Sequence, residues 1–84
     1  FIGRAEDRIA EDYLRILRFY RFTAEYANGS IDREGHEACA ATQDGLDLIS
    51  AERIRAELLK LLAALHAPIV VSEMDEAGVL TRIL

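Results

Sequence analysis

Residues 11–26, with the sequence EDYLRILRFYRFTAEY, decide the fold, because apolar and charged side chains recur there at the three- and four-residue steps of an α-helix. At about 100° per residue, one arc of this helix is polar and most of the remaining circumference is apolar. The polar arc contains Glu11, Arg15, Arg18, Arg21 and Glu25, with Asp12 at its margin. The apolar side chains are those of Tyr13, Ile16, Leu17, Phe19, Tyr20 and Ala24. One side of a small bundle does not hide this much apolar surface, so we expect a further surface to cover part of it.

The residues that flank this stretch predict its bounds. Asp12 is suited to cap a helix that runs from about Tyr13 to about Tyr26. Asn28 and Gly29 readily adopt the left-handed conformation that ends a helix. Residues 1–10 are then expected to form a connecting segment with one short helical turn.

Further helix signals follow downstream. Asp32 predicts the start of a second helix over roughly residues 33–43, which ends near Gly45. Ser50 predicts the cap of a third helix, whose apolar stripe is formed by Ile54, Leu58, Leu61, Leu62 and Leu65. Pro68 suits the first turn of a fourth helix, and Gly78 predicts its end before a final turn at residues 79–84.

No segment alternates apolar and polar residues for long enough to predict a strand. We therefore expect an all-α fold, a small bundle of four to five helices. Residues 1–84 are expected to form a single domain, with residues 1–12 as the connecting segment and residues 13–84 as the bundle.

Composition excludes several classes of protein. The 84-residue chain carries a net charge of −5, which disfavours a self-sufficient nucleic-acid binder that works by phosphate neutralisation, so any contact with RNA is expected to be local. Its single cysteine, Cys39, forms no disulfide within the chain, and no zinc motif is present. No run approaches the roughly 20 apolar residues of a membrane span. Because the chain starts at Phe1, we expect it to be cut from a longer, cytoplasmic protein.

Asp12 and Arg15 form a potential recognition pair, since side chains three residues apart on a helix are neighbours. A carboxylate accepts a hydrogen bond from an exocyclic amine, and a guanidinium donates one to a ring nitrogen. Cytosine and adenine present this combination, whereas uracil and guanine present a carbonyl beside a ring N–H. The alternative from spacing alone is a helix cap with surface ion pairs, which is the commoner meaning of such a string.

Other side chains have structural interpretations. Arg53 and Glu57 are four residues apart and are expected to pair. His36 is expected on an exposed turn, and Cys39 as a small buried apolar residue. The aromatic side chains are able to stack on bases, although packing in the interior or at an interface is the favoured interpretation for Tyr13, Phe19, Tyr20, Phe22 and Tyr26.

Three longer strings carry a resemblance to a known family. They are Phe1-Ile2-Gly3 followed by residues 8–22 (RIAEDYLRILRFYRF), residues 49–62 (ISAERIRAELLKLL) and residues 76–80 (EAGVL). The first resembles the junction of head and helical neck in bacterial class II tRNA nucleotidyltransferases, the CCA-adding enzymes of the poly(A) polymerase superfamily. The second resembles a later motif of the same neck, and the third resembles the helix-Gly-helix step that follows it. The sequence departs from the family pattern at Arg4 and Ala5, where Asp-Pro is common, and at Tyr13, which is often Pro.

The resemblance implies roles for four residues. Asp12 and Arg15 would pair with the base of the incoming CTP or ATP, Glu11 would orient Arg15, and Arg18 would support the nucleotide or the head interface. The implied partners are the chain's own catalytic head, CTP or ATP, and the tRNA 3′ end, with Mg²⁺ acting in the parent enzyme.

No catalytic or metal-binding residue is predicted in this chain, because the family's paired carboxylates belong to the head. We expect the chain alone to be inactive, to use no cofactor, and to bind neither DNA nor membrane. The competing hypothesis is a helical protein-interaction or dimerisation domain without nucleotide recognition. An exposed apolar flank of the first helix would favour a homodimer of the isolated chain.

Overall fold

The structure, a computed structural model, describes residues 5–26 and 31–83, with the side chains of residues 11–26 and 31–83. Its elements are α1 (Ala5–Tyr26), α2 (Arg33–Ala41), the 3₁₀-helix η1 (Gln43–Leu48), α3 (Ala51–Leu62), α4 (Ala67–Glu76) and α5 (Val79–Ile83). The described residues contain no strand. The prediction of a small all-α bundle is confirmed.

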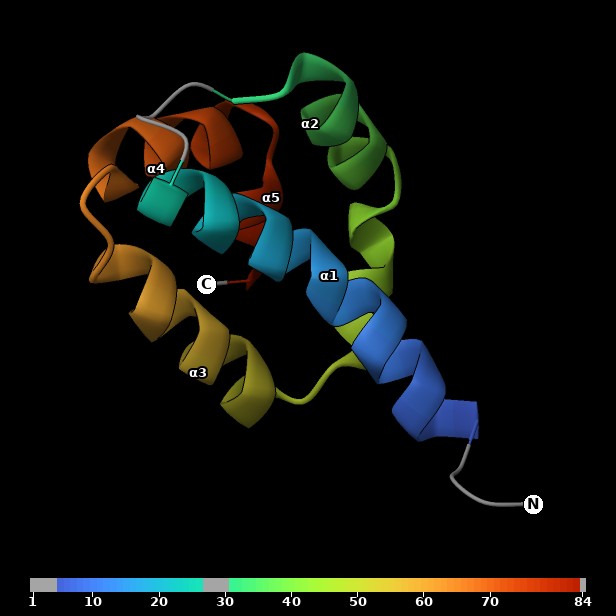
Figure 1. The fold of residues 1–84 in the computed structure, drawn as a ribbon. Coiled ribbons are helices and arrows are strands. Elements are labelled where there is room, and N and C mark those ends of the chain that lie inside the picture. The colour runs from blue at the N-terminus through green and yellow to red at the C-terminus, as the bar shows by residue number, and fades with distance from the viewer. Residues whose placement is uncertain (1–4, 27–30, 84) are drawn as a thin grey trace.

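Helix α1 is longer than predicted and crosses the whole molecule (Figure 1). It begins at Ala5 rather than at about Tyr13, because residues 5–12 contain neither glycine nor proline to interrupt it. Asp12 therefore lies within the helix and is not its N-cap. The predicted end at Tyr26 is confirmed, while the predicted stop at Asn28 and Gly29, and the first part of the connecting segment, lie outside the described residues.

The predicted signals for the later helices are confirmed. The Asp32 carboxylate accepts a hydrogen bond from the backbone N–H of Gly35 at 3.2 Å, and the Ser50 hydroxyl accepts one from that of Arg53 at 3.3 Å. Pro68 lies in the first turn of α4. Gly78 separates α4 from α5 with a φ of +81°, which L side chains rarely adopt.

The second helix ends earlier than predicted, at Ala41 rather than about residue 43. The Thr42 N–H donates to the carbonyl oxygens of both Ala38 at 3.2 Å and Cys39 at 3.3 Å, so the last turn already changes from α-helical to 3₁₀ hydrogen bonding. The chain then tightens into η1, which the sequence did not predict.

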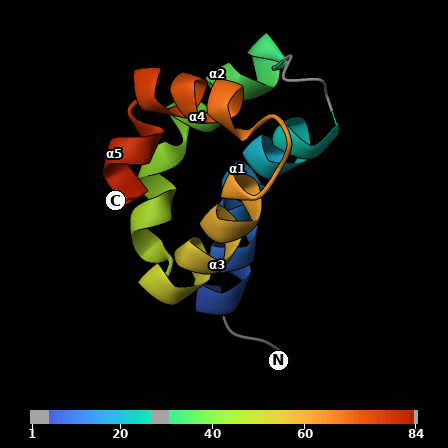
Figure 2. The same cartoon turned by 90° about the vertical axis from the view of Figure 1, so that its left-hand side faces the viewer.

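The core forms around α1, which packs against α3, α4 and η1 (Figures 1 and 2). The buried apolar side chains are Leu14, Ile16, Leu17, Tyr20, Ala24, Leu46, Ile49, Ile54, Leu61, Ala67, Val70, Met74 and Val79. The chain itself thus covers most of the apolar surface of α1, and the expectation that this surface needs outside cover is wrong for most of it. Two rings remain in solvent, Phe22 at 61% and Tyr26 at 69% exposure.

The predicted apolar stripe of the third helix is only partly buried. Ile54 and Leu61 face the core, but Leu62 is 51% and Leu65 82% exposed. A carboxylate, that of Glu57, lies in the buried face at 6% exposure. Because α3 ends at Leu62, Leu65 lies beyond the helix and does not continue its stripe.

Tyr13 packs directly on the backbone of η1 at Gly45. A Cβ atom added at Gly45 would lie 2.1 Å from Cδ1 and Cε1 of the Tyr13 ring, far inside van der Waals contact. Only glycine lets α1 and η1 approach this closely.

We expect Gly45→Ala to lower the free energy of unfolding by about 1 to 3 kcal/mol, because the tyrosine ring or the 3₁₀-helix has to move. Urea denaturation followed by far-ultraviolet circular dichroism measures the loss. The same substitution in a Tyr13→Ala background should have a much smaller effect, and additive effects of the two changes would refute the contact as the cause.

Candidate functional site

Asp12 and Arg15 lie side by side on α1 and are both exposed. Three helical residues place their side chains about 60° apart around the axis, one turn from each other. Among the side chains that the structure describes, neither residue takes part in a hydrogen bond or an ion pair. Both side chains are thus presented on one solvent-facing strip of α1.

Glu11 joins two arginines, neither of which is Arg15. Its carboxylate accepts hydrogen bonds from Nη1 of Arg18 at 3.1 Å and from Nη2 of Arg53 on α3. The expected orientation of Arg15 by Glu11 is therefore absent from the structure, since both oxygens have other partners. The hydrogen bonds from Arg53 and then Arg18 hold the pKa of the Glu11 carboxyl below its ordinary value of 4.5.

Glu57 is the buried anion between α1 and α3. Its carboxylate lies 3.1 Å from Nε of Arg21, 3.6 Å from Nε of Arg18 and 3.9 Å from Nζ of Lys60. The Arg21 contact is an ion pair without a well-aligned hydrogen bond, because its N–H does not point at the oxygen. The expected pair of Arg53 with Glu57 is wrong, since Arg53 reaches across to Glu11 instead.

These contacts form a continuous row of alternating charges across the interface of α1 and α3, which we call the charge row. Its members are Arg53, Glu11, Arg18, Glu57, Arg21 and Glu25. Because Arg18 and Arg21 both contact Glu57 of α3, these ion pairs help to fix the rotation of α1 about its axis. Arg15 and Asp12 are not members of this row and are exposed to solvent.

Sequence reasoning missed the roles of Arg21, Arg53 and Glu57 in fixing this rotation. One signal was available, because Glu57 interrupts the apolar stripe of the third helix between Ile54 and Leu61. A carboxylate in that position requires cationic partners from another element.

A buried polar pair holds α2 against α1. The Tyr20 hydroxyl lies 3.0 Å from Nδ1 of His36, and the two rings meet edge to face with centroids 5.6 Å apart. His36 is therefore buried, and its predicted place on an exposed turn is wrong. Burial raises the pKa of Tyr20, and it also raises that of the half-buried Cys39 thiol.

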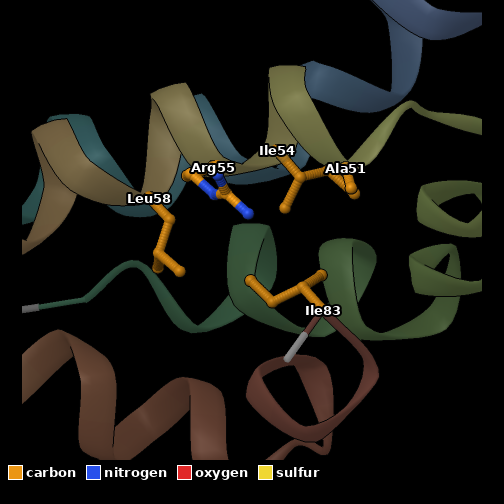
Figure 3. A pocket seen from close by; sticks show the side chains of 5 residues that line it. All are labelled: Ala51, Ile54, Arg55, Leu58 and Ile83. Atoms are coloured by element: carbon orange, nitrogen blue, oxygen red, sulfur yellow. The ribbon is translucent and has the colours of Figure 1, made fainter.

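A shallow hollow of about 300 Å³ lies between α3 and α5 (Figure 3). Ala51, Ile54, Arg55 and Leu58 line it from α3, and Ile83 lies opposite. Its walls are apolar apart from the Arg55 guanidinium, and it lies on a different face from Asp12 and Arg15.

Within the described residues, no three His, Cys, Asp or Glu side chains come together in a group able to hold a metal ion. In the same part of the chain, no helix combines the length and apolar character needed to span a bilayer.

The chain is similar to one protein family and to several curated proteins. The family described as "Probable RNA and SrmB- binding site of polymerase A" matches residues 30–84. The chain is 42% identical over 85 residues to "CCA tRNA nucleotidyltransferase 1, mitochondrial" of Mus musculus, which covers 99% of the chain and 20% of that protein. It is 48% identical over 68 residues to the Homo sapiens protein of the same name, covering 79% and 16%.

The chain is also similar to a bacterial protein. The "CCA-adding enzyme" of Streptococcus pyogenes serotype M5 (strain Manfredo) is 42% identical over 65 residues, 77% of the chain and 16% of that protein. The chain thus spans about a fifth of the length of the relatives it matches, or less. No solved structure matches it.

We expect Glu57→Gln to lower the free energy of unfolding by about 1 to 3 kcal/mol, because it leaves Arg18 and Arg21 facing a neutral group. Equilibrium urea denaturation measures the change. Glu25→Gln is the matched control, since it removes a partly exposed partner of Arg21 at 3.7 Å and should change stability by less than about 1 kcal/mol. Equal losses in the two variants would contradict a special role for the buried carboxylate.

The lowered pKa of Glu11 gives a prediction for acid pH. The contribution of its ion pairs to stability is complete above the unfolded-state pKa and is lost as the pH falls through the lower folded-state pKa. Arg53→Gln removes the stronger hydrogen bond, so the midpoint of Glu11 in a ¹³C NMR titration should rise toward 4.5. Arg33→Gln, which removes a partner of Glu73 instead, should leave that midpoint in place.

Proposed function

Because the chain belongs to the family of the probable RNA- and SrmB-binding site of polymerase A, we propose that it is the base-selecting helical neck of a tRNA nucleotidyltransferase. The parent enzyme would add C, A or both to tRNA 3′ ends. One observation carries the proposal: Asp12 and Arg15 are exposed beside each other on α1. The similarity to CCA-adding enzymes supports the choice of reaction.

The chemistry of the pair accounts for selection of C and A. The Asp12 carboxylate accepts from the exocyclic amine of either base, and the Arg15 guanidinium donates to the neighbouring ring nitrogen. Uracil and guanine present a carbonyl to the carboxylate and an N–H to the guanidinium, so both contacts become repulsive. A bidentate contact of this kind discriminates by about 1 to 3 kcal/mol.

The charge row supports this function by pre-organisation. Glu57 contacts Arg18 and Arg21, and Glu11 contacts Arg18, so these two arginines are only partly exposed whereas Arg15 is exposed. A recognition pair on a helix of fixed rotation does not have to be ordered again when the base arrives. Glu11 and Arg18 would thus support the pair through helix orientation, without touching Arg15.

The remaining parts of the reaction belong to a catalytic head of the parent enzyme. That head would supply the paired carboxylates that hold Mg²⁺ and the triphosphate of CTP or ATP. The neck would contribute only the side chains that read the base. The chain alone would therefore bind the base of a nucleotide without transferring it. The tRNA 3′ end and the head would be its two macromolecular partners.

A protein-interaction domain is the second candidate, favoured by exposed leucines in the last turn of α3 and just after it. Leu59, Leu62 and Leu65 are all more than half exposed, at 60%, 51% and 82%. Apolar side chains grouped in this way are typical of a surface that binds another protein. This function would need neither Asp12 nor Arg15.

The test is a chimera in which this chain replaces the aligned 85 residues of the Mus musculus enzyme. We expect the chimera to incorporate CTP in preference to UTP, and Arg15→Ala to reduce that preference by about tenfold, because one of two base contacts is lost. Single-turnover addition to a tRNA lacking its 3′ end measures both rates.

Arg55→Ala is the matched control, since Arg55 is an exposed helical arginine on another face. It should leave the CTP to UTP ratio unchanged. If Arg15→Ala preserves selection and rate, base reading by this pair is excluded. If Leu62→Ser then abolishes association with a partner protein, the interaction domain is the better description.

A further inference from the structure

Two aromatic rings lie in solvent on the last two turns of α1. Phe22 is 61% and Tyr26 69% exposed, and their centroids lie 5.1 Å apart with planes tilted by 49°. Phe19 differs from them, because it is half-buried and packs edge to face against Tyr20 at 5.3 Å. The two exposed rings therefore form a separate surface, the aromatic pair, that the core does not use.

The aromatic pair continues the strip that holds Asp12 and Arg15. Phe22 and Tyr26 follow Arg15 by seven and eleven residues, which places them within about 20° of it around the helix. At about 1.5 Å per residue, Phe22 lies about 10 Å along the axis from Arg15. This is the rise of about three stacked nucleotides at about 3.4 Å each.

We propose that Phe22 and Tyr26 are a stacking platform for an unpaired base of the RNA 3′ end, about three nucleotides from the base that Asp12 and Arg15 read. The inference rests on the proposed function, because it takes the RNA terminus to lie beside the incoming nucleotide. Exposed aromatic rings stack on the faces of single-stranded bases with little regard to sequence. Such a platform would hold the strand while the nucleotide at its end changes.

Charge distribution favours RNA on this face. Residues 31–84 carry ten acidic and five basic side chains, whereas residues 1–30 carry five of each. A polyanion is therefore repelled least along α1, where Arg15 is exposed and Arg18 is partly exposed. The exposed leucines of α3 lack this combination of aromatic ring and arginine.

The experiment uses the 84-residue chain and a single-stranded octaribonucleotide that ends in CC. NMR spectra recorded during the titration should show upfield shifts of the Phe22 and Tyr26 ring protons, because a stacked base shields them. The double variant Phe22→Leu/Tyr26→Leu keeps apolar side chains but removes the ring faces. We expect its dissociation constant for the oligonucleotide to rise by about tenfold.

Two controls separate stacking from general attraction. Leu65→Ala removes an exposed apolar side chain elsewhere and should leave the affinity unchanged. The same oligonucleotide paired with its complement should shift the ring protons little, because its bases are already stacked.

Three outcomes would overturn the proposal: no ring shifts with the oligonucleotide, equal affinity of the double leucine variant, or ring shifts that depend on protein concentration alone. The last would show that a second copy of the chain covers the rings. The double variant in the chimera should keep its preference for CTP over UTP, whereas Arg15→Ala should keep the RNA-induced ring shifts. Each variant thus tests one of the two proposals independently of the other.

Discussion

The ion pairs of Glu57 with Arg18 and Arg21 determine how the other parts of this molecule are arranged. A carboxylate at 6% exposure is unfavourable unless cations accompany it, so α1 and α3 pack with these three side chains at their interface. This arrangement commits two of the described arginines of α1 to a structural role. Arg15 is exposed on the neighbouring part of the helix surface, as are Asp12, Phe22 and Tyr26. The buried acid thus engages Arg18 and Arg21 of α1, whereas Arg15 is exposed to solvent.

The distribution of charge limits which part of this chain could attract an RNA. The family match to an RNA-binding site covers residues 30–84, yet that part carries twice as many acidic as basic side chains. Of its five basic residues, Arg33, Arg53 and Arg82 pair with Glu73, Glu11 and Asp47. Phosphate neutralisation alone therefore does not account for binding there. In the complex that we propose, base contacts and stacking along α1 would supply an attraction that does not depend on net charge.

Much of the fold was predictable because its signals are local. Asp32, Ser50, Pro68 and Gly78 act on backbone groups within a few residues, and each lies where the sequence predicted it. The early start of α1 was not predicted, since a helix continues past a possible cap when nothing interrupts it. The 3₁₀-helix η1 was not predicted either. For the site, spacing predicted that Asp12 and Arg15 share a face. Their roles, the cytoplasmic location and the homodimer stay predictions.

By itself, the sequence determined where helices form, where most of them end and which residues share a face, because these depend on contacts three or four residues apart. Only the tertiary structure decided which charges pair between different helices. Glu11 has a possible partner in Arg15 on its own helix, but its actual partners are Arg18 and Arg53, the second from 42 residues away. Tertiary packing also buried His36 and left Leu62 and Leu65 exposed. Such outcomes depend on how two helices cross, which no local pattern encodes.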